Sequence, residues 1–215
     1  LFSKDPQRPL TQSTVHCGRF RTDIDILDDR LIGGSILDQV NETMDFFQKH
    51  MNVRFEFTGK PQRNEIWDYP LPALREAITN AICHRSYQHN SDIQIKFFDD
   101  HLQIWNPGFL PFGLTVKKLE SGNYSSQPRN RLIAQVFYDL EMIERYGSGI
   151  RRMNDACKNA GLSIPTISDN CGGFMLRFQA QTTQAAVRAT TQVTDHVAGE
   201  VTGEVTGEVT GEVVS

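Results

Sequence analysis

The chain of 215 residues lacks the phosphate-binding loop used by the common nucleotide-driven motors. That loop has the pattern GxxxxGK[ST], in which backbone amides surround the phosphates and the lysine reaches their terminal oxygens. The only Gly-Lys pair, Gly59-Lys60, is followed by Pro61. The sequence therefore contains no motor domain of the P-loop class.

Long apolar runs are also missing. No stretch approaches the roughly 20 apolar residues that span a bilayer, and no signal-peptide pattern opens the chain. The four cysteines, at positions 17, 83, 157 and 171, have neither CxxC nor zinc-site spacing. Because the chain begins at Leu1, we expect a fragment of a cytoplasmic protein with no membrane partner and with reduced, partly buried thiols.

An excess of positive charge is absent as well. The formal net charge is -4, which argues against a surface that coats nucleic acid along the whole chain. Local cationic patches remain possible at Arg129 with Arg131, and at Arg145 with Arg151 and Arg152. Such arginines would contact nucleotide phosphates or DNA, or would simply lie on solvated helix faces.

Residues 75–87, with the sequence REAITNAICHRSY, are the most informative segment that is present. On a helix, Glu76, Asn80 and His84 share one face, because residues four apart lie above one another. The opposite face carries the apolar residues Ala77, Ile78, Ala81 and Ile82. The pattern predicts a helix with one buried face and one face for chemistry, although a solvated polar face has the same spacing.

A carboxylate and an amide oxygen one turn apart suit Mg²⁺, which takes oxygen ligands and usually fills its remaining positions with water and substrate phosphates. The glutamate can also orient or deprotonate water, and His84 and Arg85 would add donors for phosphate oxygens. This chemistry favours a nucleoside triphosphate as the ligand.

Two further segments follow. Residues 93–97 and 101–105 alternate like two strands joined by a turn, and Asn106-Pro107-Gly108 ends the second strand. Gly147-Ser148-Gly149-Ile150 opens a predicted helix that stops at Gly161, and glycines before a helix N-terminus leave free N–H groups for an anion.

Together these residues resemble a known signature. Glu76-xxx-Asn80-xxx-His84-Arg85, Asn106-Pro107-Gly108, Arg129-Asn130 and Gly147-Ser148-Gly149-Ile150 look like the divergent GHKL, or Bergerat-fold, ATP-binding domain. The form resembled is found in RecG-related proteins described as ATP-dependent DNA helicases or transcriptional regulators. The resemblance spans roughly residues 36 to 180.

The resemblance implies roles for these positions. Asn80 is the implied Mg²⁺ ligand, and Glu76 is the general base if ATP is hydrolysed. Asn106 stands where the family normally has an aspartate that binds the adenine amino group, and an amide oxygen accepts from that group more weakly. Residues 147–149 are implied to contact the phosphates.

Three parts are expected along the chain. Residues 1–34 resemble the trailing end of a Schlafen/AlbA-type DNA-binding domain, which would lie mostly outside this chain. Residues 35–180 form the ATP-binding domain. Residues 181–215 carry a TGEV repeat whose glycines and β-branched threonines disfavour a helix, so we expect a disordered linker.

The expected fold is α+β, a two-layer sandwich with helices on one face of a mixed sheet. Ser35 is a predicted N-cap for a helix with apolar residues at helical spacing. A second amphipathic helix is predicted around residues 129–147, with Leu132, Ile133, Val136, Phe137 and Leu140 facing inward. Strands are predicted in TVHCGRF, RLIGG, VRFEFTG, NEIWDYP and at 174–178.

Two classes of function remain open at this point. The first is a regulatory domain that binds Mg²⁺ and ATP and has at most weak ATPase activity. The second is a degenerate domain that has lost nucleotide and serves as a scaffold for dimerisation or protein interaction. A kinase-like phosphotransferase is disfavoured, because His84 lies within the nucleotide motif and no separate acceptor helix is evident.

Overall fold

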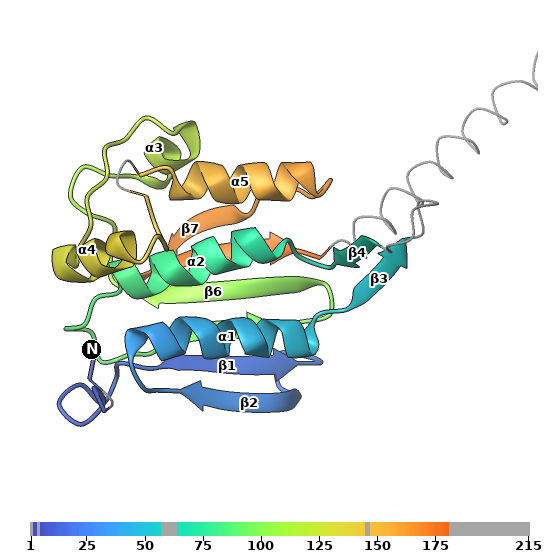
Figure 1. Ribbon diagram of the computed structural model, residues 1–215, viewed down its shortest axis with the longest axis horizontal. Coiled ribbons are helices and arrows are strands. Elements are labelled where there is room, and N and C mark those ends of the chain that lie inside the picture. Colours follow the sequence, from blue (N-terminus) through green and yellow to red (C-terminus); the bar gives the residue numbers. More distant parts are fainter. Residues whose placement is uncertain (1, 4, 57–63, 145–146, 181–215) are drawn as a thin grey trace, which may run out of the picture.

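The computed structural model describes residues 2–180 apart from residues 4, 57–63 and 145–146 (Figure 1). The predicted linker at 181–215 and the cationic residue Arg145 lie outside the described residues.

A six-stranded mixed sheet forms one layer of the fold. Its strand order is β2-β1-β5-β6-β8-β7, in which β1 and β5 are parallel and every other neighbouring pair is antiparallel. The strands are β1 (Val15–Phe20), β2 (Ile26–Ile32), β5 (Ile93–Phe97), β6 (His101–Pro107), β7 (Thr166–Asn170) and β8 (Gly173–Gln179).

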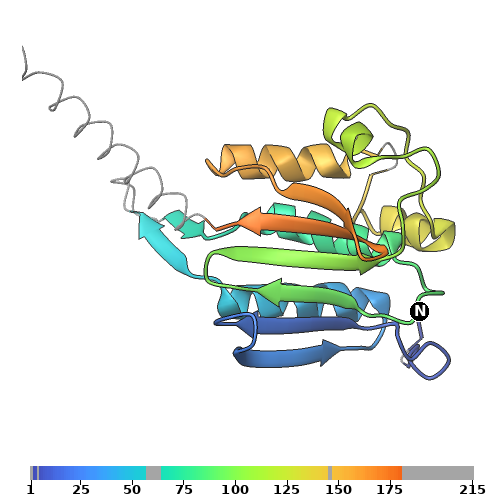
Figure 2. The same cartoon turned by 180° about the vertical axis from the view of Figure 1, so that it is seen from behind.

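Helices α1 (Ile36–His50), α2 (Leu71–His84) and α5 (Gly149–Asn159) cover one face of this sheet (Figure 1). Seen from behind, the opposite face is open (Figure 2). The short helices α3 (Val116–Ser121) and α4 (Arg131–Asp139) lie together at one end. The expected α+β two-layer sandwich is confirmed.

Local sequence explains why α1 begins where it does. The Ser35 hydroxyl accepts from the Asp38 backbone N–H, and the Asp38 carboxylate accepts from the Ser35 N–H, which completes a capping box. The apolar stripe that follows packs into the core, where Val40 and Phe47 are fully buried. The N-cap predicted at Ser35 is thus confirmed.

Strands β1 and β2 belong to the main sheet. Val15 pairs with Ile93 and Cys17 with Ile95 in the parallel β1–β5 ladder. Residues 15–32 are therefore continuous with the sheet, and no break between sheets falls at residue 34. The predicted strands β3 (Val53–Glu56) and β4 (Asn64–Trp67) instead form a separate two-stranded sheet.

Helix α4 differs from the prediction in its length and its buried face. Ile133 and Phe137 are buried, but Leu132 is 82% exposed and Leu140 is 50% exposed. The helix ends at Asp139, and Glu141 takes a positive φ of 57°. The inward orientation predicted for Leu132 and Leu140 is wrong, because a helix that stops after nine residues buries only one narrow stripe.

All four cysteines are free thiols, as expected; three are buried and Cys171 is exposed. Burial raises the pKa of Cys83 and of Cys157 to about 11, so both stay protonated at neutral pH. Among the described helices, none has the length and apolar character needed to cross a membrane.

Candidate nucleotide-binding site

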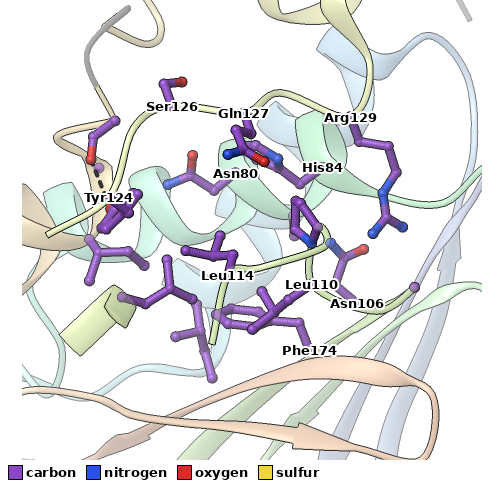
Figure 3. A pocket seen from close by; sticks show the side chains of 18 of the residues that line it. Asn80, His84, Asn106, Leu110, Leu114, Tyr124, Ser126, Gln127, Arg129 and Phe174 are labelled. Carbon is purple, nitrogen blue, oxygen red and sulfur yellow. Dashed lines mark hydrogen bonds between the residues drawn. The ribbon is translucent and has the colours of Figure 1, made fainter. Parts of the chain in front are cut away.

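Helix α2 presents the predicted chemical face. Its apolar side is fully buried at Ala73, Leu74, Ala77, Ile78 and Ile82. Pro72 is accommodated in the first turn, where a missing backbone N–H leaves no intrahelical bond unmade. Asn80 and His84 line a cavity between α2, the ends of β6 and β8, and residues 108–129 (Figure 3). Ala77 and Ala81 line the same cavity, so the prediction that these two alanines lie on the opposite face of the helix is wrong.

Seven of the predicted site residues line this cavity together, namely Asn80, His84, Asn106, Gly108, Arg129, Gly147 and Gly149. The predicted residues that do not line it are Glu76, Arg85, Asn130 and Ser148. The fold therefore brings residues of four separate sequence motifs to one place, across about 70 residues of chain.

At one end of the cavity a buried polar side chain, Asn106, lies near Leu110 and Phe174 (Figure 3). Ile104, Leu114 and Leu176 also contribute to the apolar lining of the cavity. Asn106, at the end of β6, is only 6% exposed, and its Oδ1 has no hydrogen-bond partner among the described residues. An unpaired buried oxygen of this kind costs free energy unless a ligand supplies a donor.

His84, Asn106 and Arg129 lie close together at this end (Figure 3). Burial, with a smaller effect from the Arg129 charge, lowers the pKa of His84. The imidazole is therefore neutral at pH 7 and offers one N–H donor and one acceptor nitrogen. A neutral ring suits a heterocyclic base better than the phosphate contact predicted for His84.

Glu76 and Asn80 form an acid–amide pair on α2, on the N-terminal side of His84. Asn80 Nδ2 donates to Glu76 Oε1 at 2.9 Å, which leaves Asn80 Oδ1 directed away from this bond. Glu76 is only 7% exposed, and burial raises the pKa of its carboxyl group despite the opposing effects of Arg152 and Asn80. The pair offers two oxygen ligands beside the cavity.

Arg152 also lies beside Glu76. From the sequence it was expected only as part of a cationic patch with Arg145 and Arg151. Its Nε lies 3.7 Å from Glu76 Oε2, and its Nη1 lies 3.2 Å from Glu144 Oε1. The Ser148 hydroxyl donates to Glu144 at 2.8 Å. Position 152 is one turn after Gly149 on α5, so helical spacing from the glycine motif is the signal that would have indicated it.

The glycine segment packs directly on the acid–amide pair. Gly147 has a φ of 69°, and its carbonyl accepts from the Tyr124 hydroxyl at 2.8 Å. A Cβ at Gly149 would lie 2.7 Å from Asn80 Nδ2 and would overlap Glu76 Oε1. Glycine at 149 is what allows the N-terminus of α5 to approach α2 this closely.

Gly108 is required for a related reason. Its φ is 112°, and a Cβ there would overlap the Arg129 guanidinium and lie 2.7 Å from Ser86 Cβ. The Arg129 guanidinium also donates to the Phe109 carbonyl. Gly108 thus combines a positive φ with a close approach of the Arg129 side chain, and a larger residue would disturb both.

Arg85 and Asn130 make structural hydrogen bonds. The Arg85 guanidinium is fully buried and donates to the carbonyls of Thr14 and Ser91, each at 2.9 Å. Asn130 Nδ2 donates to the carbonyls of Cys83 and Arg85, which are free because α2 ends there. Both side chains fix the end of α2 that carries His84, and the predicted contact of either one with ligand stays a prediction.

No group of three His, Cys, Asp or Glu side chains in the described part of the chain is placed to hold a metal ion. A divalent cation at Glu76 and Asn80 would therefore need ligands from water and from a bound phosphate. This donor set fits Mg²⁺, which is usually held by one or two protein oxygens together with substrate phosphates.

A family model matches part of the chain. Residues 90–178 match the family described as "Putative ATP-dependent DNA helicase recG C-terminal". The match supports an ATPase-like domain, and it covers β5 to β8 while leaving the α2 motif outside. No curated protein matches the chain.

A solved structure shares the fold. The DIP2311 protein from Corynebacterium diphtheriae superposes with a TM-score of 0.69 at 21% identity. The match covers 80% of this chain and 35% of that one, so the chain spans about a third of its length. The chain thus has the same fold as DIP2311 and contains an ATPase-like domain similar to the RecG C-terminal family.

Proposed function

We propose that the chain is an ATP-binding regulatory domain of a DNA-binding transcriptional regulator. Mg²⁺-ATP would bind between the Glu76–Asn80 face of α2 and the Gly147–Gly149 segment. Nucleotide occupancy would change the position of residues 108–129 and so bias DNA contacts made by domains mostly outside this chain. A homodimer is compatible with this role.

The observation that carries the proposal is the arrangement of polar groups in a largely apolar cavity. One end holds the unpaired Asn106 Oδ1 and the neutral His84, which suits a purine ring with an exocyclic amine. Its other end meets the acid–amide pair and the N-terminus of α5, where backbone N–H groups favour phosphate.

The chain's own residues then have distinct tasks. Mg²⁺ would neutralise phosphate charge when bound. Asn80 Oδ1 is the protein ligand best placed to hold it, because Asn80 Nδ2 is engaged by Glu76. Arg152 supplies a positive charge beside Glu76 that partly offsets the burial of this carboxylate.

Equilibrium binding of a fluorescent ATP analogue with Mg²⁺ tests the proposal. We expect binding to the native chain and a loss of about tenfold or more in Asn80→Ala, since one metal ligand is removed. Asn159→Ala, at the exposed end of α5, is the matched control and should bind normally. Absence of binding, or equal binding by Asn80→Ala, would contradict the proposal.

Hydrolysis is a separate part of the proposal. If Glu76 acts as the general base, Glu76→Gln should abolish phosphate release and leave nucleotide affinity within a few-fold, because the amide cannot take a proton. Phosphate release that continues unchanged in this variant would remove Glu76 from that role.

One observation favours the alternative, a nucleotide-free scaffold for dimerisation or protein interaction. Glu76 already has protein partners in Asn80 and Arg152, so these three side chains can join α2 to α5 without any ligand. A chain that binds no nucleotide but self-associates at micromolar concentration would support this alternative.

A further inference from the structure

The sheet face opposite the helices is not covered by another described helix (Figure 2). Polar and aromatic side chains gather on this face. A hollow on this face is lined by residues that include His89, Gln94, Lys96, Gln103, Trp105 and Met175. None of these residues lines the nucleotide cavity, which lies on the helix side of the sheet. We call this surface the sheet hollow.

Strand register arranges the sheet hollow in two rows. Lys96, Gln103 and Arg177 are cross-strand neighbours on β5, β6 and β8, and Gln94, Trp105 and Met175 form the next row. Adjacent strands are about 4.8 Å apart and alternate residues about 7 Å apart. The backbones of Lys96 and Arg177 are therefore roughly 10 Å apart, two strand spacings, and Trp105 lies in the neighbouring row.

Aromatic side chains flank the two cations. Trp105 packs edge-on against His89 with ring centroids 6.1 Å apart. Beyond the other row, Phe20, Phe98 and His101 form a continuous stack, with centroids at 5.2 Å and 4.4 Å. Lys96 Nζ lies 5.8 Å from the centroid of the Phe20 ring.

Two exposed cations lie on this surface, Lys96 and Arg177, and they form no salt bridge within the part of the chain that the structure describes. Of the nearby carboxylates, Asp99 pairs with Arg19, and Asp29 and Asp100 are hydrogen-bonded to His16 and His101. A ligand can therefore reach two unpaired positive charges here, although the chain as a whole is negative.

We propose that the sheet hollow binds single-stranded nucleic acid. Lys96 and Arg177 would contact successive phosphates, Trp105 would stack on a base, and Gln94 and Gln103 would supply amide hydrogen bonds. Flat aromatic groups between cations are the usual platform for unpaired bases, whereas the bases of a duplex are already stacked on one another. This site is independent of the proposed nucleotide site.

Fluorescence anisotropy with a labelled oligonucleotide of about 12 residues tests the proposal, at about 50 mM salt and again at higher salt. We expect single-stranded DNA, RNA or both to bind, and the matching duplex to bind much more weakly. The double variant Lys96→Gln/Arg177→Gln should bind at least about tenfold more weakly. In a plot of log affinity against log salt concentration, the slope for this variant should be shallower by about 1.4, since two phosphate contacts disappear.

The control is Arg75→Gln/Lys117→Gln, which removes the same charge from exposed positions elsewhere and should bind normally. Trp105→Phe should retain affinity and Trp105→Ala should lose it, with folding verified for each variant by circular dichroism. Because the chain has two tryptophans, Trp67→Phe leaves Trp105 as the only one, and its fluorescence should be quenched on binding.

Several results would overturn the proposal. These are no binding of either single strand, equal binding of the duplex, or equal weakening by the two double variants. Burial of Trp105 through self-association, with no effect of oligonucleotide, would assign the surface to a second copy of this chain instead.

Discussion

Single residues in and beside the α2 cavity show how burial changes the properties of polar groups. Asn106 keeps an unpaired oxygen, and Glu76 keeps a carboxyl group whose pKa is raised by burial. Neither feature helps the fold, because both desolvate a polar group without full compensation. Each therefore gives a prediction that separates a binding role from a structural one.

Replacing Asn106 with aspartate tests how the base is recognised. An amide can turn either its oxygen or its NH₂ group towards a base, so the native chain should discriminate weakly between ATP and GTP. A carboxylate only accepts, so Asn106→Asp should favour ATP over GTP by roughly fivefold more than the native chain. Competitive displacement of the fluorescent analogue measures this; an equal gain for GTP would contradict it.

Glu76→Gln should stabilise the fold in a pH-dependent manner. Because burial raises the folded-state pKa of Glu76, its contribution to stability is fully present below the unfolded value of about 4.3 and is lost as the pH rises through the folded value. Melting temperature should therefore increase by a few degrees at pH 8 and by less at pH 4.

Glu120→Gln, at an exposed position in α3, is the control for this pH series. This variant should leave the melting temperature unchanged at both pH 8 and pH 4. If Glu76→Gln instead stabilised the chain more at pH 4 than at pH 8, the predicted direction of the pH dependence would be wrong.

At the scale of secondary structure, elements with local signals were predictable. The capping box at Ser35 and the two-sided pattern of α2 both indicated real helices. Helix α3 and strand β7 were not predicted, because each is short and lacks a clear periodic pattern. The Arg152–Glu76 contact joins residues 76 positions apart, so only packing reveals it.

The buried face of α4 gives a direct comparison. Phe137→Ala should cost about 3–5 kcal/mol in the free energy of unfolding, because a fully buried ring leaves a cavity. Leu132→Ala should cost less than about 0.5 kcal/mol, because its side chain already faces solvent. Urea unfolding measures both, and similar costs would restore the inward orientation predicted for Leu132.

The contact between α2 and α5 allows a second comparison of two variants. Gly149→Ala should cost about 1–3 kcal/mol and weaken nucleotide binding, since the added methyl forces α5 away from Asn80 and Glu76. Gly33→Ala is the control, because its Cβ would make only ordinary contact, at 3.4 Å from Gln7 Oε1. A Gly149→Ala variant as stable as the control would contradict the packing described.

At the scale of the whole molecule, the first two strands are part of one sheet. The parallel β1–β5 ladder places Val15 and Cys17 in the same core as Ile93 and Ile95. The boundary expected at residue 34 came from a resemblance of residues 1–34 to another domain. The pairing of β1 with β5 has no local signature in the sequence, because more than 70 residues separate the two strands.

Removal of residues 1–34 should consequently unfold the remainder. The truncated chain should lose its cooperative urea transition, since β5 would lose its parallel partner and the core its contacts to Val15 and Ile32. A truncated chain that unfolds cooperatively at the native midpoint would show that residues 35–180 fold alone.

We propose above that the α2 cavity binds a magnesium nucleotide. A crystal structure of the chain with a non-hydrolysable ATP analogue and Mg²⁺ would show whether it does. We expect the base beside Asn106 and His84, the metal on Asn80, and the phosphates against Gly147–Gly149. A nucleotide bound elsewhere, or a cavity that stays empty at saturating analogue, would contradict it.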